Sequence, residues 1–293
     1  MIRLLPAVLL PCLLLACTND PAPQQAPEAE AAGTMATPRQ PADEARPPSL
    51  REVVAGEWRS PENRARDAFR HPVETLEFFG VQPTHSVVEI TPGGGWYAEI
   101  LAPYLYRQGR YVAAVVDPEA LPEGSGRDYQ QRSRDRLEAL FSGAPEQFDR
   151  AGVIAYDPAA PVFGTPASAD VVLTFRNVHN WMADGLAEGM FEGFFDVLRP
   201  GGVLGVVEHR AKAASAPDSG YVPQAHVVEL AQQAGFVLEE ASEVNANPRD
   251  TADHPNGVWT LPPGNNHDEA DAERYAAIGE SDRMTLRFRK PAD

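Results

Sequence analysis

Short apolar runs alternate with segments of helical spacing along most of the chain. The apolar runs are residues 86–90, 111–116, 152–156, 169–175 and 203–207. Helical spacing covers residues 96–105, 128–141, 187–198 and 224–235. Strands that are apolar on both faces are typical of a covered, mostly parallel sheet, and alternation with helices indicates right-handed crossovers. The pattern therefore predicts an α/β fold, Rossmann-like and doubly wound.

The last two predicted strands, residues 236–244 and 283–289, are joined by a long insertion instead of a helix. That pair is therefore expected to be antiparallel, which gives a seven-stranded sheet with an antiparallel last strand. The insertion, residues 245–282, is expected to be a loop near the mouth of a substrate site. Residues 60–80 are expected to form two helical pieces separated at His71-Pro72, beginning with Ser60 as a cap before Pro61.

The N-terminus has the layout of an export signal. Arg3 precedes an apolar run over residues 4–15, which ends at Ala16-Cys17. This resembles the lipobox of bacterial lipoproteins and implies removal of residues 1–16 and a lipid on Cys17. Thr18, in place of Asp, then implies sorting to the outer membrane and a location in the cell envelope facing the periplasm. The alternative is an ordinary secretory signal with an incidental cysteine.

Composition divides the remaining chain. Residues 17–50 are rich in Pro, Ala and Glu and poor in large apolar side chains, so we expect a disordered tether there. Residues 51–293 form the expected folded domain. The net charge is −17, which disfavours nucleic acid as a partner and favours a small molecule. The two cysteines, Cys12 and Cys17, both precede this domain, which therefore has neither a disulfide nor a thiolate metal site.

Candidate chemistry lies where the predicted strands end, because ligands of open α/β sheets bind beyond the carboxyl ends of strands. Four acids stand there: Glu89, Asp117, Asp157 and Glu208. The first strand is followed by Thr91-Pro92-Gly93-Gly94-Gly95, in which glycines let the backbone approach a ligand. Taken alone, these glycines also fit a dinucleotide site with Asp117 on the ribose, or a tight turn without a ligand.

Two features separate these alternatives. Glu89 precedes the glycines, where it would repel the pyrophosphate of a dinucleotide. The segment Leu198-Arg199-Pro200-Gly201-Gly202 then joins a helix to the fifth strand. Together with the order of motifs over residues 87–207, these features resemble the class I S-adenosylmethionine-dependent methyltransferases. In that family the acid faces the ammonium of the cofactor's methionine part.

The resemblance implies that S-adenosylmethionine is the cofactor. The residues that it implies for cofactor binding are Glu89, Thr91, Gly93, Gly94, Gly95, Asp117 and Asp157. Among them Asp117 is expected on the ribose hydroxyls and Asp157 on the adenine amino group. One position departs from the family pattern, because Thr91 stands in place of the first glycine and Pro92 stiffens the loop.

The segment after the fourth strand is expected to face the transferred methyl group. His179 is the candidate catalytic base and Asn177 a catalytic positioning group. The alternative for His179 is a hydrogen-bonded structural histidine, and Arg176 is a candidate for an acidic group of the substrate. Trp181 is a candidate to close the pocket or to stack on a substrate, and Tyr221 lies in a loop that is a candidate lid. No HxH or HxxxH spacing occurs, so no metal site is expected.

Two functions follow from these observations. The first is an S-adenosylmethionine-dependent methyltransferase acting on a small molecule. The second is a lipid-anchored envelope protein that keeps the same fold and binds another ligand or a partner without catalysis. They conflict because the cofactor is made in the cytoplasm, whereas the N-terminal signal directs the domain outward.

Overall fold

The computed structural model describes residues 46–292. The predicted signal, Cys17 and most of the predicted tether therefore lie outside the described residues. The first described helix is α2 (Leu50–Val54). Ser49 caps it, and Ser49 and Glu52 form a reciprocal capping box that satisfies two otherwise free backbone N–H groups.

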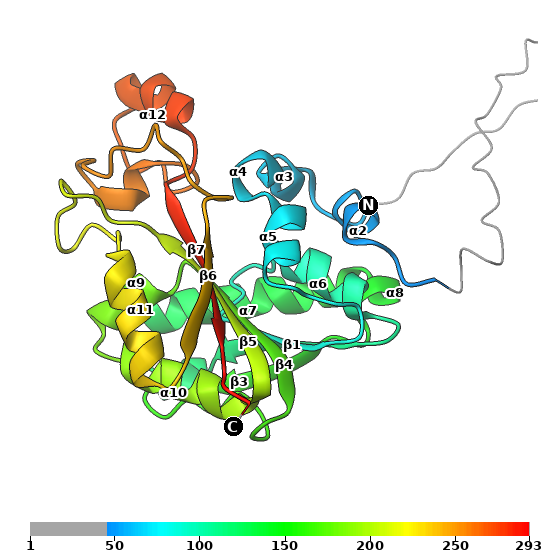
Figure 1. Cartoon of the computed structure of the whole chain (residues 1–293). Coiled ribbons are helices and arrows are strands. Elements are labelled where there is room, and N and C mark those ends of the chain that lie inside the picture. Colours follow the sequence, from blue (N-terminus) through cyan, green and yellow to red (C-terminus); the bar gives the residue numbers. More distant parts are fainter. Residues whose placement is uncertain (1–45, 293) are drawn as a thin grey trace, which may run out of the picture. The chain divides into compact units, whose positions relative to one another are not determined.

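A seven-stranded sheet forms the centre of this domain (Figure 1). Its strands are β1 (Ser86–Ile90), β2 (Arg110–Val116), β3 (Gly152–Tyr156), β4 (Ala169–Phe175), β5 (Leu198–His209), β6 (Val237–Ser242) and β7 (Arg283–Arg289). The strand order is β3-β2-β1-β4-β5-β7-β6. The first five strands pair in parallel, whereas β7 is antiparallel to both β5 and β6. The predicted doubly wound sheet is confirmed.

The strand order reverses between β1 and β4. β1 pairs with β2 on one side and β4 on the other, so that Val88 lies opposite both Val112 and Val172. Crossovers on the two sides of this point run over opposite faces of the sheet. The loops after β1 and β4 therefore separate and leave a crevice at the carboxyl edge.

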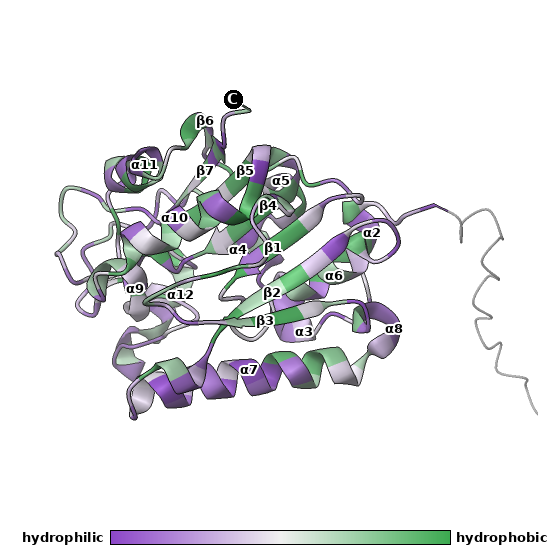
Figure 2. Ribbon diagram, turned by 90° about the horizontal axis from the view of Figure 1, so that it is seen from below, coloured by the Kyte–Doolittle hydropathy of each residue, from purple (hydrophilic) through white to green (hydrophobic). Residues whose placement is uncertain are grey.

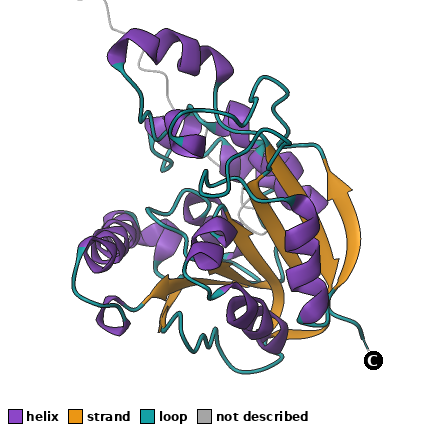
Figure 3. Cartoon of the chain, turned by 90° about the vertical axis from the view of Figure 1, so that its left-hand side faces the viewer, coloured by secondary structure: helices purple, strands orange, loops and turns teal. Residues whose placement is uncertain are grey.

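Helices cover both faces of the sheet (Figure 3). One core includes side chains from α9 (Val178–Ala183), α10 (Ala187–Val197) and α11 (Gln224–Gln233). The other includes side chains from α2, α5 (Pro72–Phe78), α6 (Ala98–Leu105), α7 (Ser125–Gly143) and α8 (Pro145–Phe148). α7 is strongly polar on its outer side, and Ser133 and Leu137 are its buried residues (Figure 2).

Two predicted boundaries were wrong. Residues 60–80 form three helices instead of two: α3 (Pro61–Arg64), α4 (Asp67–Arg70) and α5. The predicted break at His71-Pro72 is present, where His71 is left-handed with φ 41°, and a second break at Ala65-Arg66 separates α3 from α4. β5 begins at Leu198 instead of residue 203, since Leu198 already pairs with Ala169. The turn at residues 199–202 is therefore part of an irregular strand.

The insertion is also more ordered than predicted. It contains η2 (Gly257–Thr260), η3 (Glu269–Asp271) and α12 (Ala272–Ile278). The Asp250 carboxylate is fully buried and accepts hydrogen bonds from the Tyr221 hydroxyl and from the N–H of Asp282, at 3.0 and 2.7 Å. This carboxylate therefore ties the insertion to the start of β7. Among residues 46–292, no helix has the length and apolarity needed to span a membrane.

Candidate functional site

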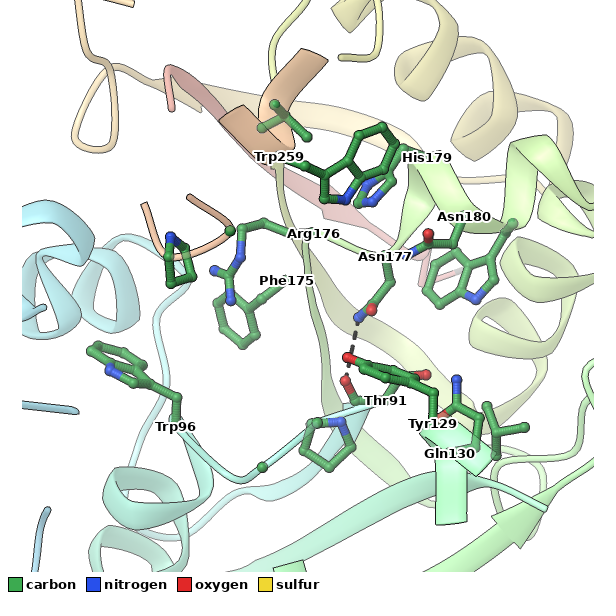
Figure 4. Close-up of a pocket in the computed structure, with 18 of the residues that line it drawn as sticks. Thr91, Trp96, Tyr129, Gln130, Phe175, Arg176, Asn177, His179, Asn180 and Trp259 are labelled. Atoms are coloured by element: carbon green, nitrogen blue, oxygen red, sulfur yellow. Dashed lines mark hydrogen bonds between the residues drawn. The ribbon is translucent and has the colours of Figure 1, made fainter. Parts of the chain in front are cut away.

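A cavity of about 1210 Å³ opens at the carboxyl edge of the sheet, where the ends of β1 and β4 meet (Figure 4). Its wall includes the loop after β1, the segment after β4, the N-terminal helices α3 and α4, and part of the insertion. A single drug-sized ligand occupies about 300–1,000 Å³. The cavity is therefore large enough for two small molecules side by side.

The loop after β1 presents bare backbone to the cavity. Gly93 has φ +60°, and a Cβ placed on it would meet no atom within 4 Å. Gly95 has φ +91°, but a Cβ there would lie 2.7 Å from a methyl carbon of Leu140. Gly93 and Gly94 line the cavity, whereas Gly95 allows the loop to pack against α7. The predicted glycines thus divide between a ligand-facing position and a packing position.

Thr91 occupies the left-handed region at φ 50°, a conformation in which glycine is the usual residue. Its hydroxyl and the Tyr156 hydroxyl are 2.7 Å apart and share a hydrogen bond. Asn177 donates from Nδ2 to the Ile90 carbonyl at 3.1 Å and weakly to the Thr91 carbonyl at 3.5 Å (Figure 4). The threonine is therefore held by its neighbours, and Asn177 fastens the β1 loop to the end of β4.

Glu89 lies at the cavity wall and is only 2% exposed. The Tyr111 hydroxyl donates a hydrogen bond of 2.7 Å to Glu89 Oε2. Burial raises the pKa of Glu89 to about 7, against the lowering effects of this hydrogen bond and of the charge on Arg176. A cationic ligand beside Glu89 would favour its ionised form.

Asp117 and Asp157 are absent from the described residues that line the cavity. Each carboxylate accepts a hydrogen bond from a backbone N–H two residues later, that of Glu119 at 3.1 Å and that of Ala159 at 2.9 Å. Both acids thus shape the turns after β2 and β3. Their neighbours Val116 and Pro158 do line the cavity, and the contacts of the two acids with a cofactor stay a prediction.

His179 and Glu208 form a hydrogen-bonded pair in this wall. His179 Nδ1 lies 3.0 Å from Glu208 Oε1, and Glu208 is completely buried. Both carboxylate oxygens accept backbone N–H groups, from Val178 at 2.6 Å and from His209 at 2.7 Å. Because the carboxylate accepts throughout, Nδ1 of His179 is the donor and Nε2 keeps its lone pair. Sequence reasoning placed Glu208 at the rim and missed this pairing.

His209 completes a cluster that the expectation of no metal site did not foresee. Ligand atoms of His179, Glu208 and His209 lie within 4.8 Å of one another, a spacing that a metal ion could use. His209 Nδ1 is instead 2.6 Å from the Ser281 hydroxyl. Burial lowers the pKa of His209 well below its usual range, and the positive charge of Arg283 lowers it further. Nδ1 of each histidine in this cluster thus has a hydrogen-bond partner within the protein.

Aromatic rings form much of the remaining wall. Tyr97 and Phe175 stack with ring centroids 3.7 Å apart, and Trp259 from the insertion lies 6.0 Å from the His179 ring. Trp181 is 5% exposed and packs on Phe194, so its ring contributes mainly to the core. Tyr221, a lid candidate, is buried, and its hydroxyl donates to the Asp250 carboxylate.

The cavity also contains residues that sequence reasoning did not connect with a site. These are Arg66 at the N-cap of α4, Arg70 in α4, Trp259 from the insertion, and Glu280, Ser281 and Arg283 around the start of β7. None belongs to a loop that directly follows a parallel strand, which is where the sequence predicts ligand-binding residues. Arg176, predicted to bind an acidic group of a substrate, does line the cavity among them.

Known proteins resemble this chain in structure but not in sequence. No known family profile and no curated protein matches the sequence. Solved structures do match. One is a SAM-dependent methyltransferase from Aquifex aeolicus, with 12% identity, a TM-score of 0.52, and coverage of 84% of this chain and 98% of that one. Another, assigned as a sarcosine dimethylglycine methyltransferase from Galdieria sulphuraria, has 14% identity, a TM-score of 0.53, and coverage of 79% and 87%.

The [4+2]-cyclase SpnF matches as well, with 16% identity, a TM-score of 0.55, and coverage of 83% of this chain and 92% of the cyclase. The chain therefore has the fold of the class I S-adenosylmethionine-dependent methyltransferases. A fold hosts different reactions, so the activity has to be argued from the site.

Proposed function

We propose that this protein is an S-adenosylmethionine-dependent methyltransferase acting on a small-molecule acceptor. The observation that carries the proposal is the shared cavity. It brings the bare backbone of the β1 loop and the oriented His179 side chain to one space large enough for a cofactor and an acceptor.

The residues at the β1 loop suit the methionine part of the cofactor. The open space above Gly93 accommodates a ligand pressed against the backbone, and Glu89 offers a buried carboxylate for an ammonium group. Val116 and Leu121 offer apolar surface beside the predicted ribose and adenine positions of Asp117 and Asp157. The cofactor would supply an electrophilic methyl group on a sulfonium.

The protein's own contribution is to orient the acceptor and take its proton. His179 Nε2 accepts the proton of an acceptor hydroxyl, amine or thiol, while Glu208 fixes the tautomer and stabilises the imidazolium that forms. Trp259 and the stacked Tyr97 and Phe175 exclude water from the same space, which strengthens these interactions. General base catalysis of this kind contributes about 10²–10⁴-fold in rate.

Calorimetry on the full-length chain tests the cofactor assignment. Titrations with S-adenosylmethionine and S-adenosylhomocysteine should release or absorb heat, whereas NAD should not. Asp117→Ala should weaken binding of either sulfur compound by about 1–3 kcal/mol through lost charge-assisted hydrogen bonds. Asp149→Ala, an exposed acid after α8, is the matched control. Absence of heat with both sulfur compounds at about 1 mM would overturn the proposal and support a non-catalytic ligand-binding role.

We also propose, from the N-terminal sequence alone, that a lipid on Cys17 anchors the protein in the cell envelope. The apolar run ending at Ala16-Cys17 supports this location. The proposal requires either a source of S-adenosylmethionine outside the cytoplasm or methyl transfer before export.

A further inference from the structure

The cavity differs in charge from the chain as a whole. The full sequence has 25 basic and 42 acidic residues. Among residues 46–292, the cavity wall holds six arginines against four carboxylic acids: Arg66, Arg70, Arg127, Arg136, Arg176 and Arg283, with Glu89, Glu123, Asp184 and Glu280. The cavity wall is therefore net positive, although the chain as a whole is net negative.

Four of these guanidinium groups interact electrostatically with one buried acid, Glu280. Arg66 Nε lies 2.6 Å from Glu280 Oε1 and Arg70 Nε lies 3.1 Å from Oε2, while Arg283 donates to the same Oε2. Burial raises the pKa of Glu280, but the positive charges of Arg283, Arg70 and Arg66 outweigh it and bring the pKa to about 2. Glu280 is therefore ionised at neutral pH and balances only one positive charge.

Arg176 is the member of this group without a bound partner. Within the described part of the chain, its guanidinium makes no hydrogen bond or ion pair, and it projects into the cavity beside Phe175 (Figure 4). Its backbone has φ 61°, a conformation costly for a long side chain, and its N–H is held by the Val207 carbonyl at 2.7 Å. In this strained backbone conformation, the Arg176 side chain points into the cavity.

The cluster remains charged despite its burial. Burial and the nearby charge on Arg283 lower the pKa of Arg176 to about 10, which still leaves it protonated at neutral pH. Arg66 has a second buried nitrogen without a hydrogen-bond partner. Arg70 lies over the Trp96 ring at 4.7 Å. Concentrated positive charge in a partly buried wall is unfavourable for stability unless a ligand compensates it.

We propose that Arg176, together with Arg70 and Arg283, binds a carboxylate or phosphate group of the methyl acceptor. This inference rests on the proposed function and names the acceptor's chemical class, an anionic small molecule. Four guanidinium groups against one carboxylate leave three positive charges. The amino-acid part of S-adenosylmethionine carries a single carboxylate, so it would leave positive charge for a second anion.

Binding of small anions to the full-length chain tests the inference. Succinate, its neutral diamide and inorganic phosphate are titrated with S-adenosylhomocysteine at saturation, and tryptophan fluorescence and calorimetry report binding. Succinate or phosphate should bind, and the diamide should bind at least tenfold more weakly. Arg176→Met should lower the affinity for succinate at least tenfold and change the affinity for S-adenosylhomocysteine by less than twofold. Arg176→Lys should retain part of the affinity, since it keeps the charge.

Arg107→Met, at an exposed arginine after α6, is the matched control and should change neither affinity. Circular dichroism melting checks that each variant folds. Equal affinity for succinate and its diamide would overturn the inference. A second pattern would also overturn it: Arg176→Met lowers the affinity for S-adenosylhomocysteine tenfold, but leaves the affinities for decarboxylated S-adenosylhomocysteine and for succinate unchanged. The cluster would then bind the carboxylate of the cofactor.

The same titrations without S-adenosylhomocysteine separate the two proposals. If the sulfur compounds fail to bind but succinate binds in an Arg176-dependent way, the methyltransferase function is wrong and the anion site stands. If the sulfur compounds bind and no anion does, the cofactor assignment stands and the acceptor is not anionic.

Discussion

At the scale of single residues, the buried side chain of Glu208 orients His179, the candidate base. Glu208 is fully buried, which would be costly for an acid if its oxygens did not accept N–H groups from Val178 and His209. The same donors leave one direction open on Oε1, and His179 occupies it. His179 is therefore oriented by a residue whose sequence position at a strand end gave no indication of the pairing.

The tautomer of His179 should follow from this arrangement. In ¹⁵N NMR spectra at neutral pH, Nδ1 should carry the proton in the native protein. Glu208→Gln should give a mixture of tautomers, because an amide cannot accept at both of its atoms, and should cost about 1–3 kcal/mol of stability. Exposed His226 on α11 serves as the internal reference. A proton fixed on Nε2 in the native protein would contradict the assignment of His179 as the base.

Glu89 should make stability depend on pH. Its folded pKa of about 7 exceeds the ordinary value of 4.5, so the folded state holds a proton that the unfolded state releases between these values. Raising the pH from 5 to 8 should therefore destabilise the native protein relative to Glu89→Gln by about 3 kcal/mol. Urea unfolding at the two pH values measures the difference. Tyr111→Phe removes the hydrogen bond that lowers this pKa and should extend the loss to higher pH.

At the scale of elements, the loop after β1 lines the cavity on one side and packs against α7 on the other. Its glycines are adjacent in sequence, yet Gly93 faces the cavity and Gly95 faces α7. Glycine spacing alone could not assign these roles, because both positions have positive φ. The neighbours of each Cβ position decide between them, and these neighbours come from α7, more than forty residues later.

Alanine substitutions should separate the two roles. Gly95→Ala should lower the free energy of unfolding by about 2–4 kcal/mol, since the left-handed conformation and the contact with Leu140 both oppose a methyl group. Gly93→Ala should cost about 1–2 kcal/mol from conformation alone. Gly93→Ala should nevertheless lower the affinity for S-adenosylhomocysteine more than Gly95→Ala does. Equal stability losses in denaturant unfolding, or unchanged ligand affinity for Gly93→Ala, would contradict this division.

At the scale of the whole molecule, charge is distributed unevenly between surface and cavity. The net charge of −17 repels polyanions over the general surface, whereas the arginines inside attract a small anion that can enter. The proposed lipid on Cys17, which lies outside the described residues, would attach the molecule to a membrane.

Lipid attachment can be measured directly. An alkyne-labelled fatty acid should be incorporated into the native chain, and Cys17→Ser should abolish the label and leave an unprocessed precursor, since the thiol is the acyl acceptor. Cys12→Ser, within the apolar run, is the matched control and should keep the label. Globomycin should block processing of the native chain. A Cys17→Ser variant that remains labelled would contradict the lipobox interpretation.

The sequence by itself determined the order of strands and helices, the antiparallel end of the sheet and the position of the ligand edge. These features depend on local periodicity and on which residues follow each strand, so they can be read without contacts. For the same reason Glu89, Thr91, Gly93, Gly94, Asn177 and His179 were found, and all of them line the cavity.

Only the tertiary structure decided the partners within the site. The Glu208–His179 pair, the separate roles of Gly93 and Gly95, and the placement of Asp117 and Asp157 at turns depend on which side chains meet across the sheet. The arginine cluster joins Arg70 in α4, Arg176 directly after β4 and Arg283 in β7, which are separated by more than a hundred positions at each step. Such contacts arise from the folding of distant segments onto one edge, which no local pattern encodes.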